Sequence, residues 1–190
     1  MLNIVLFGPP GAGKGTQSEK IIAKYKLAHL STGDIFRDHL ARQTDLGKKV
    51  KEYIDNGLLV PDELTVGILK DAMLANTGAT GFIFDGFPRT VAQAEVLDQM
   101  LTASGTPIKT VVALDVNEDV VRTRIEERRK VSGRADDEES KVVRRIDEYY
   151  QKTVQVLPYY EKQGKLKKIN GVGAVESIFD NISSIIDAAK

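Results

Sequence analysis

The chain of 190 residues contains no cysteine and no tryptophan, and it has only two histidines. Without cysteine it can form no disulfide, use no thiol nucleophile and hold no cysteine-bound zinc. His29 and His39 alone are too few for a histidine metal cage. The 27 basic and 27 acidic side chains cancel, so no general attraction to nucleic acid or membranes is expected. Any anion must therefore be bound by a local cluster of charge.

Long apolar runs are missing as well. No segment approaches the ~20 apolar residues that a membrane-spanning helix needs. The N-terminus enters a strand pattern at once, without the charged and apolar regions of a signal peptide. We therefore expect a cytoplasmic protein whose length suits one well-buried core with small insertions.

A glycine-rich segment near the N-terminus carries the most information. The apolar residues 2–7 lead into residues 8–16, with the sequence GPPGAGKGT, and a helical pattern begins at Lys14. Glycines let backbone N–H groups turn toward a phosphate, the helix dipole favours negative charge, and the lysine reaches the terminal phosphates. The segment predicts a phosphate-binding loop (P-loop) for a nucleoside triphosphate.

This loop differs from two related patterns. A dinucleotide-binding loop requires a third glycine where Thr16 stands. In the commonest P-loop a hydroxyl residue follows the lysine and meets Mg²⁺, whereas Gly15 follows it here. Another group must help to place the metal. Asp85, at the end of an apolar run, is our candidate for holding Mg²⁺ directly or through water.

Short apolar runs alternate with helical patterns along the chain. We expect strands at residues 2–7, 28–31, 81–85, 111–116 and near 166–170. We expect helices at residues 14–25, 34–42, 46–56, 62–75, 90–103, 118–129 and 175–187. Thr90 and Gln93 have the spacing of a capping box. The alternation predicts an α/β fold with a parallel sheet flanked by helices, whose ligands bind at the carboxyl ends of the strands.

Two segments depart from this alternation. Residues 31–60 hold two helical stretches with no strand between them, which predicts a helical insert. Residues 126–139 form a dense charge run broken by Ser132 and Gly133. Because this run is too polar to pack in a core, we expect a short exposed flap carried on two helices.

Several arginines point to a second phosphate site. Arg124 and Arg128 are four residues apart and share a helix face, Arg134 lies in the flap, and Arg145 lies on the following helix. Arg89 follows a turn, and Arg37 opens the insert; either could grip a phosphate with two hydrogen bonds. We expect the remaining arginines of this region to be solvated; these are Arg122, Arg129 and Arg144.

In order and spacing these motifs resemble the adenylate kinase family, which makes two ADP from ATP and AMP. The resemblance covers essentially the whole chain, through residues 8–17, 31–37, 57–60, 85–89, Gln93, 124–128, 132–137 and Arg145. It implies a single P-loop kinase domain with its core at residues 1–30, 61–126 and 138–190. The AMP-binding insert would be residues 31–60, and a short lid without structural zinc would be residues 127–137.

The resemblance also implies roles for individual residues. The ATP site would comprise Gly11, Ala12, Gly13, Lys14, Gly15, Thr16, Arg124 and Arg128, with Gly173 beside the adenine. The AMP site would comprise Thr32, Arg37, Leu58, Leu59, Val60, Gly86, Phe87, Pro88, Arg89 and Gln93, with Arg134 and Arg145 bridging the two phosphate chains. The catalytic residues would be Lys14, Arg89, Arg124, Arg128, Arg134 and Arg145. The peptide bond between Phe87 and Pro88 is often cis in this family.

The implied reaction needs no general base, because the attacking phosphate oxygen of AMP is largely ionised at neutral pH. Catalysis then reduces to alignment and charge stabilisation of an in-line transfer, with Mg²⁺ accompanying ATP. ATP, AMP and ADP are the expected partners, and nucleic acid and membrane are not. No long apolar seam is left over, so we expect a monomer.

Three alternatives remain. A UMP/CMP kinase would have the same fold, but Thr32 and Gln93 favour AMP, since a glutamine amide can pair with an adenine edge. A nucleotide-dependent switch would need an Asn-Lys-x-Asp stretch, which the sequence lacks. A catalytically inactive binding module is disfavoured by the presence of Lys14, Arg89 and Arg128.

Overall fold

A five-stranded parallel sheet forms the centre of the molecule in the computed structural model, which describes residues 1–190 apart from the side chain of Ala135. The strands are β1 (Asn3–Phe7), β2 (Ala28–Ser31), β3 (Phe82–Asp85), β4 (Ile108–Asp115) and β5 (Leu166–Asn170). Their order across the sheet is β2-β3-β1-β4-β5, and all neighbouring pairs are parallel. The predicted fold class is therefore confirmed.

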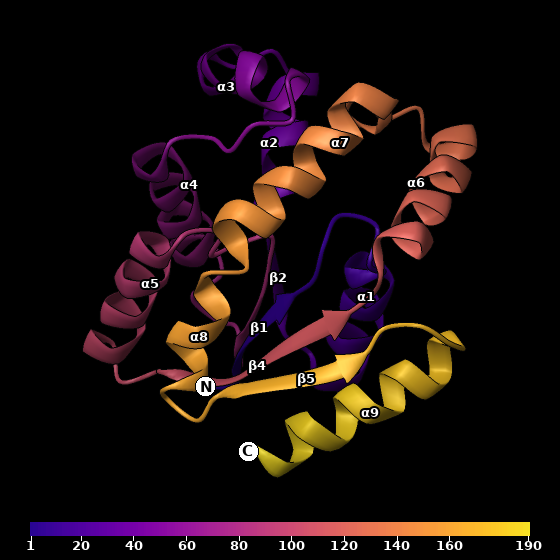
Figure 1. Cartoon of the computed structure of the whole chain (residues 1–190). Helices are drawn as coiled ribbons and strands as arrows, with labels where there is room; N and C mark the ends of the chain where they lie inside the picture. Colours follow the sequence, from indigo (N-terminus) through magenta and orange to yellow (C-terminus); the bar gives the residue numbers. More distant parts are fainter.

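Helices cover both faces of this sheet (Figure 1). The α-helices are α1 (Lys14–Tyr25), α2 (Thr32–Ala41), α3 (Asp45–Asp55), α4 (Asp62–Leu74), α5 (Val91–Ala103), α6 (Glu118–Ser132), α7 (Glu139–Glu148), α8 (Val156–Glu161) and α9 (Val175–Ala188). A short 3-10 turn, η1 (Ala135–Asp137), precedes α7, and a π-helical segment, η2 (Tyr149–Thr153), follows it. Among the described residues, no helix is long and apolar enough to span a membrane.

Alternating side chains of the strands divide the core into two layers. Ile4 and Leu6 of β1 belong to a cluster with buried side chains of α1, α6, α7 and α9. Val5 and Phe7, which point to the opposite face, belong to a cluster with α4, α5 and α8. All five residues of β1 are buried, as expected for a central strand of a parallel sheet.

The helical insert has a small apolar cluster of its own. Phe36 of α2, Val50 of α3 and Ile68 of α4 pack together with Val60, in a cluster distinct from the two layers of the sheet. In Figure 1, α2 and α3 stand above the sheet near α7. The expected insert is therefore a pair of helices with a separate core, joined to the rest of the molecule at β2 and α4.

The expectation that the flap is exposed is wrong for part of it, two residues of η1. α6 continues to Ser132 and α7 begins at Glu139, so only a short connection containing η1 links them. Asp136 and Asp137 of η1 are buried, with 9% and 1% of their surfaces exposed. The charge run packs because these carboxylates pair with arginines on α6 and α7. β4 also begins earlier than expected, because Ile108 pairs with Asn3 of β1.

Candidate active site

The P-loop connects the carboxyl end of β1 to the first turn of α1. Gly11 and Gly13 have φ values of 82° and 94°, which favour glycine. A Cβ on Gly11 would lie 2.7 Å from a side-chain carbon of Ile125, so the loop and α6 are in close contact. Lys14 Nζ donates hydrogen bonds to the carbonyl oxygens of Gly8 (2.8 Å) and Pro9 (3.0 Å). Its ammonium group is thus held inside the loop.

Lys14 belongs to a buried cluster of positive charge. Burial lowers its pKa from 10.5 to about 8; Asp85 opposes this shift, while Arg89, Arg145 and Arg128 add to it. Burial and, after it, the charge of Arg145 likewise lower the pKa of Arg89 to about 10. Buried cations that repel one another destabilise the folded protein, and a highly charged anion bound among them would relieve this repulsion.

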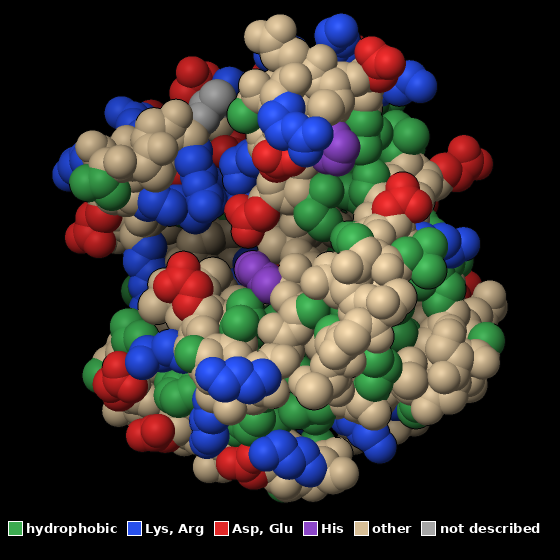
Figure 2. All heavy atoms as spheres, turned by 180° about the vertical axis from the view of Figure 1, so that it is seen from behind, with side chains coloured by type: hydrophobic (Ala, Val, Ile, Leu, Met, Phe, Trp, Pro, Cys, Tyr) green, Lys and Arg blue, Asp and Glu red, His purple; other side chains and the backbone are tan. Residues whose placement is uncertain are grey.

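A cavity of about 670 Å³ lies over the P-loop. It is lined by all the residues predicted for ATP and for the bridging of phosphates: Gly11, Ala12, Gly13, Lys14, Gly15, Thr16, Arg124, Arg128, Arg134, Arg145 and Gly173. Three residues predicted for AMP (Arg37, Gly86 and Arg89) and the predicted metal residue Asp85 line it as well. Figure 2 shows Lys and Arg side chains gathered beside a hollow in the surface. The residues predicted for the ATP site and the arginines predicted to bind phosphate therefore line one cavity.

A smaller cavity lies between the insert and the sheet. It is lined by eight of the residues predicted for AMP and by Arg145: Thr32, Arg37, Leu58, Leu59, Val60, Gly86, Arg89, Gln93 and Arg145. Thr32 Oγ1 donates to the carbonyl oxygen of Gly86 (2.9 Å), which joins the insert to the end of β3. Gly86, Arg89 and Arg145 line both this cavity and the larger one.

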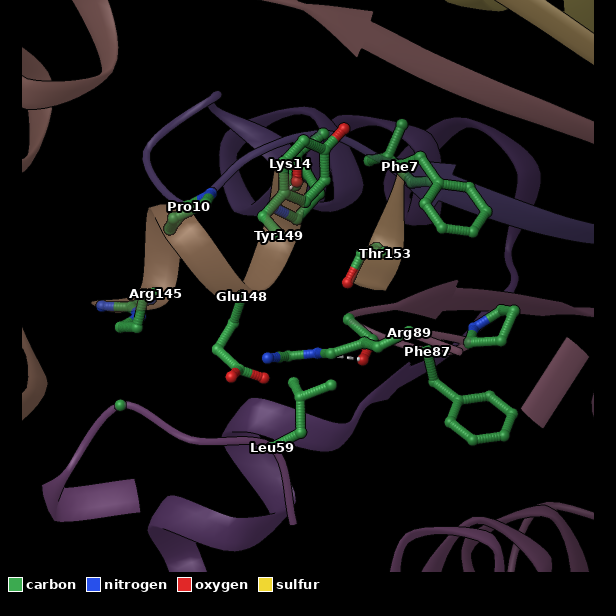
Figure 3. Close-up of a pocket in the computed structure, with 15 residues that line it drawn as sticks. Phe7, Pro10, Lys14, Leu59, Phe87, Arg89, Arg145, Glu148, Tyr149 and Thr153 are labelled. Carbon is green, nitrogen blue, oxygen red and sulfur yellow. Dashed lines mark hydrogen bonds between the residues drawn. The ribbon is translucent and has the colours of Figure 1, made fainter. Parts of the chain in front are cut away.

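A third pocket lies beside these cavities and contains the remaining predicted residues, Phe87 and Pro88. The bond between them is cis, as the resemblance implied. Phe87 is 1% exposed and its side chain packs in the core, which anchors the turn to the rest of the protein. In Figure 3 the side chains of Arg89 and Glu148 point toward one another across the pocket. Glu148 and the neighbouring Tyr149 were not predicted as lining residues.

Arg124 contacts the P-loop directly. Its guanidinium donates to the carbonyl oxygens of Ala12 and Gly171, at 3.1 Å each. α6 is thereby tied to the loop and to the segment before α9. The arginines that we expected to be solvated behave so: Arg129 and Arg144 are exposed, and Arg122 pairs with Glu118 on its own helix.

Two carboxylates of η1 hold one arginine of α6 and one of α7. Arg128 donates to both oxygens of Asp137, through Nε (2.8 Å) and Nη2 (2.5 Å). Arg145 donates to Asp137 (3.1 Å) and pairs with Asp136 (2.9 Å). Burial would raise the pKa of Asp137, but the hydrogen bond and charge of Arg128 outweigh it and hold the pKa below its usual value. Sequence reasoning missed this pairing because acidic residues beside arginines usually indicate a solvated surface.

Asp85 is suited to assist a metal ion but not to hold one alone. Its side chain is 12% exposed, lies 3.8 Å from His29 Nε2, and lines the cavity over the P-loop. The described residues contain no cluster of three or more acidic or histidine side chains that could form a metal cage. One carboxylate next to a phosphate site fits Mg²⁺, which is usually held by one or two carboxylates, substrate phosphates and water.

Gln93 is 2% exposed, and its amide is fixed at both ends. The oxygen accepts from the backbone N–H of Arg89 (2.7 Å), and the nitrogen donates to Asp62 (2.6 Å). Thr90 caps α5 by accepting from Gln93 N, but the glutamine side chain returns to Arg89 instead of Thr90. The capping box is thus only half formed. Asp62 was not predicted, since an acidic residue in a first helical turn is unremarkable in sequence.

The chain is similar in sequence to known proteins over almost its whole length. A model of the adenylate kinase family matches residues 6–165. The chain is 46% identical to the adenylate kinase of Flavobacterium johnsoniae over 188 residues, covering 98% of this chain and 99% of that protein. It is 48% identical to the adenylate kinase of Bacteroides fragilis over 187 residues, with the same coverage. The adenylate kinase of Caulobacter vibrioides is 44% identical over 98% of this chain and 97% of its own length.

Proposed function

The chain belongs to the adenylate kinase family and is an ATP:AMP phosphotransferase, and we propose that the two cavities joined by Gly86, Arg89 and Arg145 are its donor and acceptor sites. ATP would lie over the P-loop with its adenine near Gly173. AMP would lie between the insert and the sheet. The reaction yields two ADP and is reversible, because the phosphoanhydride bond broken in ATP is replaced by an equivalent one formed on AMP.

The observation that carries this assignment is the sharing of three arginines between the cavities. Arg37, Arg89 and Arg145 line both spaces, so each can contact a phosphate bound on either side. Transfer in line between two nucleotides requires the attacking and leaving oxygens to approach along one axis. Shared cations between the two sites supply charge where that axis would lie.

The positive charge of the site would stabilise the negative charge of the phosphates during transfer. Lys14, Arg124 and Arg128 would stabilise the phosphates of ATP, and Arg89, Arg134 and Arg145 would stabilise the group in transfer. Magnesium would enter with ATP, with Asp85 holding it directly or through water, and would neutralise phosphate charge. The substrate phosphate of AMP is its own nucleophile, so the scarcity of histidine is no obstacle.

The carboxylates of Asp136 and Asp137 pair with Arg128 and Arg145 in this structure. Arg37 is occupied in the same way by Asp34, at 2.5 Å. Phosphates would have to compete for these guanidinium groups. We propose that residues 127–137 act as the lid and residues 31–60 as the AMP-binding insert, and that these ion pairs rearrange when nucleotides bind. One chain lines both cavities, which supports a monomer.

Substrate specificity tests the assignment to AMP. ADP formation would be measured with ATP as donor and AMP, dAMP, CMP, UMP and GMP as acceptors. We expect AMP to have the highest kcat/KM. The UMP/CMP alternative is not favoured, since the relatives above are adenylate kinases; equal or faster turnover of CMP would nevertheless overturn the assignment to AMP.

Arg89→Ala tests the proposed site itself. Loss of a charge-assisted hydrogen bond costs about 1.5–3 kcal/mol, so we expect ADP formation to fall roughly ten- to more than a hundredfold. Thermal unfolding and circular dichroism should show an intact fold. Arg144→Ala removes the same side chain from an exposed position on α7 and should leave the rate unchanged. Near-normal turnover by Arg89→Ala would contradict the role of Arg89.

A further inference from the structure

Asp62 lies outside the residues that the family resemblance places in the AMP site. It occupies the first turn of α4, directly after the segment containing Leu58 and Val60. One carboxylate oxygen accepts from Gln93 Nε2 (2.6 Å), and the other accepts from Thr90 Oγ1 (3.1 Å). Thr90 Oγ1 in turn accepts from the backbone N–H of Gln93 (3.1 Å). The carboxylate therefore closes a ring of hydrogen bonds around the start of α5.

We infer that Asp62 is a positioning residue that fixes the orientation of the Gln93 amide and thereby selects acceptor bases that carry an amino group. The inference rests on the proposed placement of the acceptor base beside Gln93, which lines the AMP cavity. The backbone N–H of Arg89 holds the amide oxygen of Gln93, while the side chain of Arg89 points into the neighbouring pocket (Figure 3).

The orientation is fixed because the two partners of the amide have opposite requirements. The N–H of Arg89 needs an acceptor, and the carboxylate of Asp62 needs a donor. Turning the amide by 180° would place its oxygen against the carboxylate and its NH₂ group against the N–H of Arg89. Both contacts would be lost and both would become repulsive, in a side chain that is 2% exposed.

The fixed amide has one N–H donor and one oxygen lone pair left for a ligand. Adenine and cytosine present a ring nitrogen acceptor beside an amino donor, which matches this pair. Hypoxanthine, guanine and uracil present a carbonyl acceptor beside an N–H donor, in the reversed order, and would need the amide to turn. The hydrogen-bond pattern does not depend on the size of the base, so the amide separates amino from oxo bases and not purines from pyrimidines.

The test compares kcat/KM for AMP, IMP and CMP in wild type and in Asp62→Ala. We expect the variant to lower the AMP/IMP ratio about tenfold or more, equivalent to the loss of one oriented hydrogen bond. The AMP/CMP ratio should change less than about twofold, because both bases carry the amino pattern. Asp62→Asn keeps an acceptor oxygen for Gln93 and should restore most of the AMP/IMP ratio.

Glu63→Ala is the matched control, since Glu63 is an exposed acidic residue in the same helical turn. It should leave all three values unchanged. If Asp62 only stabilises the start of α4, Asp62→Ala will lower all three values in proportion, and an unchanged AMP/IMP ratio overturns the inference. Failure of the proposed function looks different: wild type itself would then show no preference for AMP over IMP and CMP.

Discussion

At the scale of single residues, Lys14 carries part of the electrostatic cost of the site. Burial lowers its pKa from 10.5 to about 8, so the folded protein releases this proton more readily than the unfolded chain. Between about pH 8 and 10.5 the unfolded chain binds more protons, and the free energy of unfolding must therefore rise with pH across this window. Below pH 8 both states are protonated, and the full cost of burying the charge is present.

Lys14→Met removes this titration and gives the first prediction. Relative to the variant, wild type should gain roughly 2–3 kcal/mol of stability between pH 7.5 and 10. Urea unfolding of both proteins at several pH values measures the difference in their free energies of unfolding. The titration of other groups, such as Arg89, contributes to both proteins and cancels in this difference. The variant also loses the bonds from Lys14 to Gly8 and Pro9, so only the change with pH is informative. Parallel stability curves would contradict the lowered pKa.

At the scale of elements, the contact between α2 and α3 depends on one glycine. A Cβ on Gly47 would lie 2.2 Å from the carbonyl oxygen of His39, a distance that requires the helices to separate. We expect Gly47→Ala to cost about 1–3 kcal/mol and to raise the KM for AMP several-fold, with the KM for ATP unchanged. Gly67→Ala in α4 meets nothing within 4 Å and should be neutral or stabilising by about 0.5–1 kcal/mol. An unchanged KM for AMP in Gly47→Ala would refute the role of this contact.

The connection between α6 and α7 depends on Asp137 in the same way. Removing a buried carboxylate leaves Arg128 and Arg145 without their shared partner. We therefore expect Asp137→Ala to speed amide hydrogen exchange in residues 133–141 while the strands of the sheet keep their protection. Glu126→Ala changes the same charge at an exposed position on α6 and should have no effect. Equal exchange in Asp137→Ala and wild type would show that the ion pairs do not order this connection.

The elements that were predictable from sequence are those with a local pattern. Apolar runs marked the strands, and the spacing of glycines around Lys14 marked the P-loop. The burial of Asp137 and the role of Asp62 were not predictable, because each depends on a partner that only the fold brings near. The same holds for Arg124, whose contacts with Ala12 and Gly171 span 112 and 47 residues of sequence.

At the scale of the whole molecule, the cavity over the P-loop and the cavity beside the insert lie at the carboxyl edge of one sheet, and helices outside the sheet contribute to their lining. Leu6 of β1 and Asp85 of β3 are paired in register, so the P-loop and the Arg89 turn begin from fixed neighbouring points. α2 and α3 share an apolar cluster with Val60 and with Ile68 of α4, and only a short connection links α6 to α7. In the proposed function, the sheet holds the phosphate-transfer axis, and residues 31–60 and 127–137 are the covers that close over it.

This division leads to a prediction about water, which competes with AMP as a nucleophile. If both covers must close before the arginines surround the transferring group, ATP alone leaves the site incomplete and wet. Phosphate release from Mg-ATP without AMP should then be at least about a hundredfold slower than ADP formation with AMP. Adenosine in place of AMP is the control: it fills the base site without offering a phosphate to Arg89 and Arg145, so hydrolysis should stay slow. Brisk phosphate release from ATP alone would show that closure does not protect the reaction.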